Sequence, residues 1–218
     1  MTSLRQKQRQ QREEAIKRVA DLLFQEQGFS QTNVEDIAAR AEVGVATIYK
    51  YFGSKGGILC QLLWPDITAI REAGEQVLMN PPLDPAEAVF KLVSSYKFGD
   101  HWAHKELLKG LIGFDLGYGE PFEALRREVD AFIAMQIREL LLNASRQGKL
   151  RQGLDLADMA TVIYAILNHN FQDYIVAEKD MDNATYVERL RRHILLLFEG
   201  WRAAATMAPA RKKSLRRA

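Results

Sequence analysis

Apolar residues recur at intervals of three and four along almost the whole chain. This spacing places them on one face of an α-helix, whereas a half-buried strand shows strict alternation of apolar and polar residues. No stretch of such alternation bounded by hairpin turns occurs in the sequence. The pattern therefore predicts an all-α fold of about nine helices.

Glycine and proline residues divide this helical pattern into segments. Gly28 is free to adopt a left-handed conformation and ends a first helix predicted over residues 8–27. Residues 80–85 (NPPLDP) break the chain, and Pro65 either kinks a helix or starts a new one. The later helices are expected over residues 85–98, 101–114, 121–147, 155–178 and 183–204.

Two short helices are predicted between Gly28 and Ser54. The sequence from Thr32 to Glu35 has the pattern of a capping box, with the Thr32 hydroxyl on the Glu35 amide, and starts the first of them. Residues 42–44 form the turn, the second helix begins near Val45, and Ser54 is expected to cap the helix that follows. A longer helix followed by two short ones and a tight turn is typical of a helix-turn-helix DNA-binding unit.

The second short helix has two chemically different faces. Val45, Ile48 and Phe52 share one face and are expected to pack on the preceding helix. The other face carries a methyl, a hydroxyl, a cation and a phenol, which suit base edges and phosphates in a major groove. Lys55 starts the next helix, where a cation is unfavourable unless an anion such as a DNA phosphate is present, and a solvated lysine is the alternative. The residues predicted to contact DNA are Thr32, Ala46, Thr47, Tyr49, Lys50, Tyr51 and Lys55.

The stretch from Thr32 to Leu59 resembles the DNA-binding signature of TetR-type transcriptional regulators. The resemblance covers about the first quarter of the chain and includes Thr47, Tyr49, Tyr51, Phe52, Ser54 and Lys55 in one register. Three residues depart from the signature. Glu42 stands where the family usually has glycine and is expected to take a positive φ; Gly44 replaces a capping serine, and Lys50 replaces a common histidine.

The resemblance implies a homodimer that presents two recognition helices to a palindromic operator, usually as a repressor released by a small molecule. Twofold repetition is also expected because one short helix reads too few bases for useful specificity. The implied domains are a DNA-binding domain (1–55), a ligand-binding and dimerisation domain (56–205) and a basic, disordered tail (206–218), with a nonspecific DNA contact as the alternative for the tail. The last two long helices, residues 156–178 and 186–201, are expected to form the dimer.

The ligand pocket is expected among the middle helices, by the same resemblance, and its aromatic residues favour an apolar or aromatic effector. The effector would act through the helix that begins at Ser54, with Pro65 as the hypothesised bending point. Ordinary core packing is the alternative for each pocket residue. The candidates are Trp64, Phe90, Tyr96, Trp102, Phe114, Phe132, Tyr164, Asn168 and Phe171.

Composition narrows the cellular setting. The formal net charge is only +2, so any basic surface is local. The single cysteine, Cys60, cannot form an internal disulfide; it fits a reducing compartment and a buried apolar role, with a redox sensor as the alternative. A polar N-terminus and the lack of an apolar run of about 18 residues predict a cytoplasmic protein without membrane contact.

Two other functions compete with a ligand-responsive regulator. His101 and His104, with His169 or Asp100, could bind zinc in an enzyme, but the pair lacks the HExxH spacing. The sequence contains no GxSxG, phosphate-binding loop or dinucleotide fingerprint, so we expect no catalytic residue, metal or cofactor. The second alternative is an architectural or adaptor protein that binds DNA with the same fold but has no inducer.

Overall fold

The computed structural model describes residues 4–97, 120–177 and 181–202. These ranges contain no strand, and the only strand-like pairing among them is an isolated bridge between Leu150 and Arg202. The prediction of an all-α fold is confirmed. The helix predicted over residues 101–114 and the tail 206–218 lie outside the described residues. The helices are α1 (Leu4–Gln27), α2 (Val34–Arg40), α3 (Val45–Phe52), α4 (Lys55–Met79), α5 (Pro85–Ser95), α7 (Glu120–Arg146), α8 (Leu156–Val176) and α9 (Asn183–Trp201).

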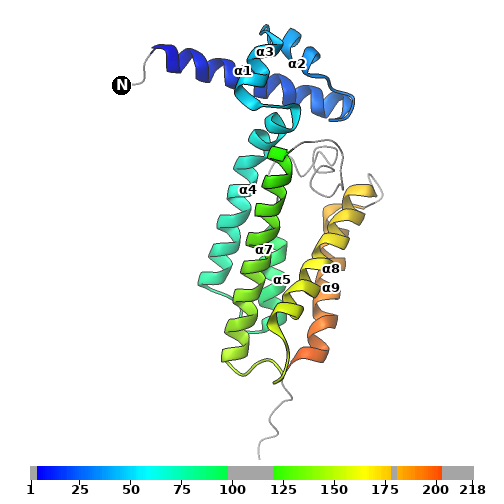
Figure 1. Cartoon of the computed structure of the whole chain (residues 1–218). Coiled ribbons are helices and arrows are strands. Elements are labelled where there is room, and N and C mark those ends of the chain that lie inside the picture. The colour runs from blue at the N-terminus through cyan, green and yellow to red at the C-terminus, as the bar shows by residue number, and fades with distance from the viewer. Residues whose placement is uncertain (1–3, 98–119, 178–180, 203–218) are drawn as a thin grey trace, which may run out of the picture.

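Helices α1, α2 and α3 form a small unit at one end of the molecule (Figure 1). Ile16, Ala20 and Phe24 of α1 are fully buried in this unit. Gly28 has φ 85° and follows the last residue of α1, as predicted. Helix α1 begins at Leu4 rather than at residue 8, and residues 4–12 are all exposed. The first turns of α1 therefore extend beyond the core of the unit.

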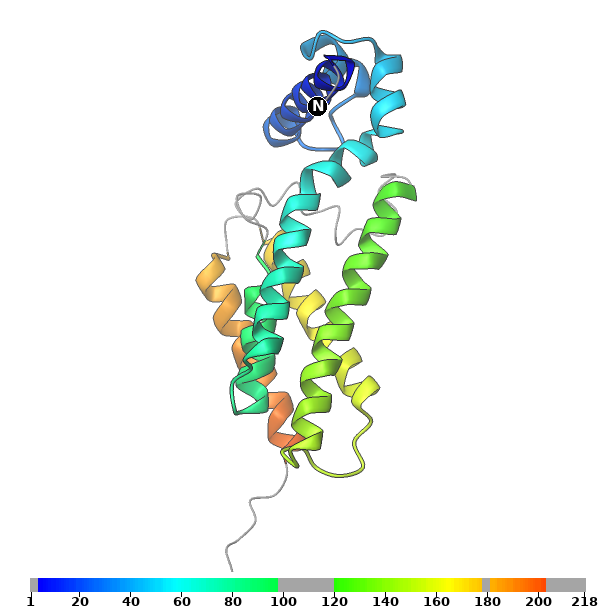
Figure 2. The same cartoon turned by 90° about the vertical axis from the view of Figure 1, so that its left-hand side faces the viewer.

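Helix α4 leads from this unit into a bundle formed with α5, α7, α8 and α9 (Figures 1 and 2). Ser54 caps α4 by accepting a 3.0 Å hydrogen bond from the Gly57 amide, as predicted. Pro65 lies inside α4, so the interpretation of Pro65 as the start of a new helix is wrong. Proline lacks an N–H group, which leaves the Gln61 carbonyl without its usual helical donor. The stretch remains one helix of 25 residues that connects both parts of the chain.

Aspartates define the starts of the later helices, because a carboxylate accepts hydrogen bonds from the free amides of a first turn. Asp84 caps α5 and Asp155 caps α8, each by accepting hydrogen bonds from two amides of the first turn. Asp182 caps α9 through the Thr185 amide at 2.7 Å, which lowers the pKa of this carboxyl. Helix α5 ends at Ser95, three residues before its predicted end. No helix in the described ranges combines the length and the apolar character needed to cross a membrane.

Candidate DNA interface and ligand pocket

Helices α2 and α3 pack through small and branched apolar side chains. Ile37, Ala38, Ile48 and Phe52 are buried between these helices and their neighbours, as the sequence predicts. The turn between α2 and α3 places Glu42 at φ 54°, so the expected positive φ is confirmed. This packing fixes the direction in which the outer face of α3 points.

The outer face of α3 is open to solvent. Ala46, Tyr49 and Lys50 are exposed, whereas Thr47 and Tyr51 are half-buried. Arg9 of α1 lies over the Tyr51 ring, with 5.5 Å between the guanidinium carbon and the ring centroid. A cation near the ring face is attracted by its quadrupole, so α1 supports one flank of the exposed face of α3.

Thr32 is buried completely, which contradicts its predicted contact with DNA. Its hydroxyl donates to the carbonyls of Gly28 at 2.8 Å and Leu23 at 3.3 Å, and accepts from Gln27 Nε2 at 3.2 Å. The capping box is also wrong, because α2 begins at Val34 after Asn33, which makes no side-chain cap. Thr32 instead closes the connection between α1 and α2.

Lys55 is not a free cation at the start of α4. Its ammonium donates to the carbonyls of Phe29 and Thr32, both at 2.7 Å, and lies 4.3 Å from the centroid of the Phe29 ring. Partial burial lowers the pKa of the Lys55 ammonium. The carbonyls after α1 satisfy two of its three N–H groups, so the charge does not require an external phosphate, and the DNA contact of Lys55 stays a prediction. Lys55 ties the start of α4 to the connection between α1 and α2.

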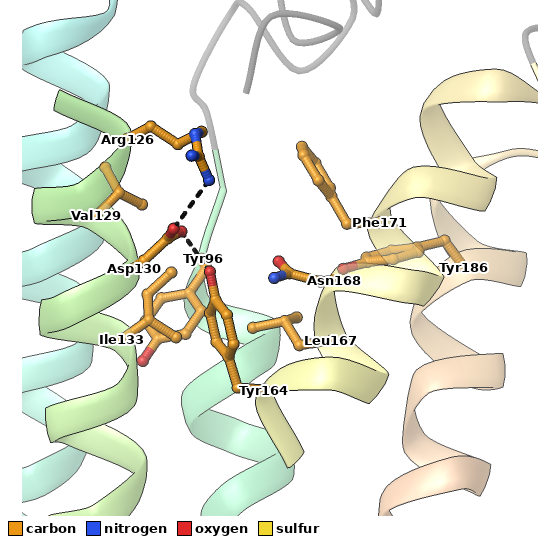
Figure 3. Close-up of a pocket in the computed structure, with 10 residues that line it drawn as sticks. All are labelled: Tyr96, Arg126, Val129, Asp130, Ile133, Tyr164, Leu167, Asn168, Phe171 and Tyr186. Atoms are coloured by element: carbon orange, nitrogen blue, oxygen red, sulfur yellow. Dashed lines mark hydrogen bonds and ion pairs between the residues drawn. The ribbon is translucent and has the colours of Figure 1, made fainter. Parts of the chain in front are cut away.

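A pocket opens between α5, α7, α8 and α9 (Figure 3). Its cavity volume is about 60 Å³, and the space rises to about 550 Å³ when the open solvent at its mouth is counted. Most of its wall is apolar or aromatic, which is typical of sites for small organic molecules. The lining residues are Tyr96, Arg126, Val129, Asp130, Ile133, Tyr164, Leu167, Asn168, Phe171 and Tyr186.

A polar cluster occupies one side of the pocket. Arg126 donates to Asp130 at 3.3 Å, and the Tyr164 phenol donates to Asp130 (Figure 3). Arg126 also donates to Glu123 at 3.2 Å. Burial raises the pKa of Tyr164, and the hydrogen bond to the Asp130 carboxylate raises it further. Tyr164 therefore stays a neutral donor at physiological pH, and the cluster can exchange hydrogen bonds with a polar group of a ligand.

A second buried contact lies behind Tyr96, at the end of α5. Its phenol donates to Gln136 Oε1 on α7 at 2.8 Å. Burial raises the pKa of Tyr96, which keeps the phenol protonated and able to donate. On the far side of the pocket, Tyr186 of α9 lines the wall, and its ring lies 5.0 Å from the ring of Tyr174 of α8 at a tilt of 44°.

The structure brings together four of the nine predicted ligand residues, namely Tyr96, Tyr164, Asn168 and Phe171. Trp64 is 49% exposed on α4 and does not line the pocket. Phe90 lies under Arg191 and Phe132 under Arg71, and neither lines the pocket. Trp102 and Phe114 lie outside the described residues. The lining residues that the prediction missed are Arg126, Val129, Asp130, Ile133, Leu167 and Tyr186. For Arg126 and Asp130 the sequence did hold a signal, because residues four apart lie on the same face of a helix.

The described residues contain no group of three or more His, Cys, Asp and Glu side chains arranged to hold a metal ion. His101, His104 and Asp100 lie outside those ranges. His169 is exposed on α8, where its Nε2 is 3.7 Å from Asp173 Oδ2.

The described residues form a helix-turn-helix unit that one long helix, α4, joins to a helical bundle with a pocket, an arrangement typical of DNA-binding transcriptional regulators. Residues 16–62 match the family described as "Bacterial regulatory proteins, tetR family". The resemblance of this segment to TetR-family regulators, seen in the sequence, is confirmed.

The HTH-type transcriptional regulator EthR of Mycolicibacterium smegmatis is 30% identical over 92 residues. This match spans 41% of the chain and 42% of that relative, so it covers less than half of either protein. Solved structures extend the likeness of fold over most of the chain. Thermus thermophilus FadR in complex with lauroyl-CoA is 24% identical, with a TM-score of 0.65 over 90% of this chain and 98% of that one.

Two further structures have the same fold at lower identity. Bacillus subtilis FadR in complex with stearoyl-CoA is 20% identical, with a TM-score of 0.65 over 86% of this chain and 98% of that chain. SmeT, the repressor of the Stenotrophomonas maltophilia multidrug efflux pump SmeDEF, is 18% identical, with a TM-score of 0.65 over 91% and 94%.

Proposed function

We propose that the chain is a repressor that binds a palindromic operator as a homodimer and leaves it when a small molecule occupies the pocket. The observation that carries the proposal is the continuity of α4. This helix begins in hydrogen-bonded contact with the helix-turn-helix unit through Lys55 and packs in the bundle beside α7, which lines the pocket. A change at the pocket can therefore alter the position of α3.

The DNA surface of the proposed repressor is the exposed face of α3. Lys50 and Tyr49 are the most prominent polar groups on it, and Ala46 and Thr47 offer methyl groups to thymine. Tyr51, supported by Arg9, lies at the edge of this face. We assign base contacts to the exposed side chains and a phosphate contact to the Tyr51 hydroxyl.

The dimer surface of the proposed repressor is the outer side of α8 and α9. Val162 of α8 and Leu196 of α9 are 40% and 66% exposed, although both are large apolar residues. Ile166 and Leu197 are half-buried beside them. Apolar surface exposed on two adjacent helices is typical of an interface, because burying it against a second copy removes it from water.

The part of the proposed effector that occupies the pocket has an apolar body and one polar group, and a larger headgroup would remain outside the pocket. The apolar body fits the wall that contains Ile133, Leu167 and Phe171, and the polar group would meet Arg126 and Asp130. Two FadR proteins of the same fold hold lauroyl-CoA and stearoyl-CoA. We therefore name long-chain acyl-CoA thioesters as the first effector class, and aromatic compounds of similar size as the second.

The test begins with selection of bound fragments from genomic DNA by the purified full chain. One or a few palindromic sites beside promoters are expected, whereas many dispersed sites would favour an architectural role. Fluorescence anisotropy on a selected site, with and without lauroyl-CoA, then measures release. Free CoA is the control for the headgroup alone. Binding that no acyl-CoA and no aromatic compound weakens would contradict the ligand-responsive function.

A further inference from the structure

Buried polar side chains are few in the described part of the chain: Thr32, Gln136 and Asn170. Gln136 is only 1% exposed and lies on α7, where α7 meets both α4 and α5. A buried amide requires hydrogen-bond partners, because burial without them costs free energy. The partners of Gln136 belong to different parts of the molecule.

The Gln136 amide joins the pocket wall to the backbone of α4. Its Oε1 accepts the 2.8 Å hydrogen bond from the phenol of Tyr96, which lines the pocket. Its Nε2 donates to the Arg71 carbonyl of α4 at 3.0 Å. A displacement of the Tyr96 ring would therefore leave a buried amide oxygen without its donor, which favours a rearrangement of the amide and of its hydrogen bond to the Arg71 carbonyl.

Gly74 leaves room for this arrangement on α4. A Cβ atom at Gly74 would lie 2.7 Å from Gln136 Cδ and 2.8 Å from Gln136 Nε2, which is closer than real Cβ contacts. Since glycine in a helix interior is unfavourable relative to alanine, this glycine has a local cost that the amide contact offsets. The same helix is fixed at its other end by the two hydrogen bonds of Lys55.

We propose that Gln136 is the relay through which pocket occupancy reaches α4. The relay rests on the proposed function, since it describes how the same pocket would control DNA binding. A ligand that shifts Tyr96 breaks the bond to Gln136, which releases the Arg71 carbonyl and lets α4 move. Lys55 then carries this movement to the connection between α1 and α2. Coupling of this kind is a free energy shared between two sites, so it is measurable as a change in their mutual affinity.

The first test needs no effector. Hydrogen exchange measured by mass spectrometry on the full chain compares the wild type with Tyr96→Phe, which removes one hydroxyl, and Gln136→Met, which removes both hydrogen bonds at similar side-chain volume. We expect exchange in residues 70–79 to accelerate about threefold or more in both variants, because α4 opens more easily. Ser94→Ala is the matched control, since the Ser94 hydroxyl donates only to the Lys91 carbonyl of its own helix.

Exchange in α4 equal to that of the Ser94→Ala control in both variants would overturn the relay. Gln136→Met could lose stability as a whole, and Tyr96→Phe, which keeps its ring, then decides the outcome. A thermal melt of each variant separates global unfolding from local opening of α4.

The second test measures coupling with lauroyl-CoA as the probe and a selected operator as the DNA. We expect Gln136→Met, which lies outside the pocket lining, to bind lauroyl-CoA within about threefold of wild type while the effect of lauroyl-CoA on operator affinity falls about fivefold or more, within the usual range of such coupling. Equal coupling in wild type and variant would overturn the relay. If lauroyl-CoA does not bind the wild type, the proposed effector class fails, and hydrogen exchange alone decides the relay.

Discussion

Gly74 of α4 faces the side-chain amide of Gln136 on α7 so closely that a methyl group at Gly74 would lie 2.7 Å from Gln136 Cδ. The overlap falls on a side chain rather than on backbone, so it can be relieved by moving the amide. That movement breaks the hydrogen bonds to Tyr96 and to the Arg71 carbonyl. The effect of a substitution at Gly74 therefore depends on which residue stands at position 136.

We predict that Gly74→Ala destabilises the wild type by about 1–3 kcal/mol, the usual effect of leaving a buried polar group unsatisfied. In a Gln136→Ala background the same change should stabilise the protein by up to about 1 kcal/mol, because alanine favours the helix. Urea denaturation followed by circular dichroism measures all four proteins. Gly200→Ala is the control, since a Cβ there would meet nothing within 4 Å. Equal effects of Gly74→Ala in both backgrounds would show that the two residues are independent.

Lys50 and Lys55 are expected to act differently although both lie near the DNA-binding surface. Lys50 is exposed on α3, so Lys50→Ala should leave stability within about 0.5 kcal/mol. If Lys50 contacts a base, the substitution should weaken operator binding by about 1–3 kcal/mol. If Lys50 contacts a phosphate, the substitution should reduce the slope of log affinity against log salt concentration by about 1. Anisotropy titrations over a range of salt concentrations on operator and random duplexes distinguish the two roles.

Lys55→Met should reduce stability by about 1–2 kcal/mol, because it removes two hydrogen bonds to carbonyls in a partly solvated site. We also expect Lys55→Met to bind all DNA duplexes more weakly, because the helix-turn-helix unit is held less firmly against α4. Thermal denaturation with and without operator measures both effects. A variant that melts like the wild type but binds all duplexes more weakly would instead restore the direct phosphate contact expected from the sequence.

The sequence predicted those features of the DNA-binding unit that depend on neighbouring residues. The cap at Ser54 follows from a local rule and the positive φ of Glu42 from the family resemblance, and both are confirmed. The local rules did not predict that the Thr32 hydroxyl and the Lys55 ammonium bond to backbone carbonyls before their own helices, as far away as Leu23 and Phe29. A local capping rule cannot detect such partners.

The pocket was predictable only in part, for a related physical reason. Tyr164, Asn168 and Phe171 lie on one stretch of α8, so their shared side of the helix could be inferred from spacing. Arg126 and Asp130 resemble an ordinary ion pair on a helix surface, and only the packing of α7 beside α8 turns them into a pocket wall. The exposure of Trp64 depends in the same way on which side of α4 meets the bundle.

Leu196→Glu should convert the proposed homodimer into a monomer with little operator affinity. Leu196 is 66% exposed on α9, and a charge there would be desolvated on association with a second copy. Leu83→Glu is the matched control, because Leu83 is 84% exposed but lies between α4 and α5. Sedimentation equilibrium gives the mass of each variant, and anisotropy gives its affinity for the operator. If Leu196→Glu and Leu83→Glu both sediment with the mass of a dimer, the dimer surface does not include Leu196.

The thiol of Cys60 should be unreactive in the folded protein. Burial raises its pKa from 9.0 to about 11, so at pH 8 the thiolate fraction is about 100-fold smaller than in an unfolded chain. Alkylation by iodoacetamide should slow by a similar factor, since the thiolate is the nucleophile. Between pH 9 and 11 the unfolded chain loses this proton first, so this group makes the protein less stable as the pH rises. The wild type and Cys60→Ala should bind operator equally before and after treatment with hydrogen peroxide. If oxidation abolishes DNA binding by the wild type but not by Cys60→Ala, Cys60 is a redox sensor.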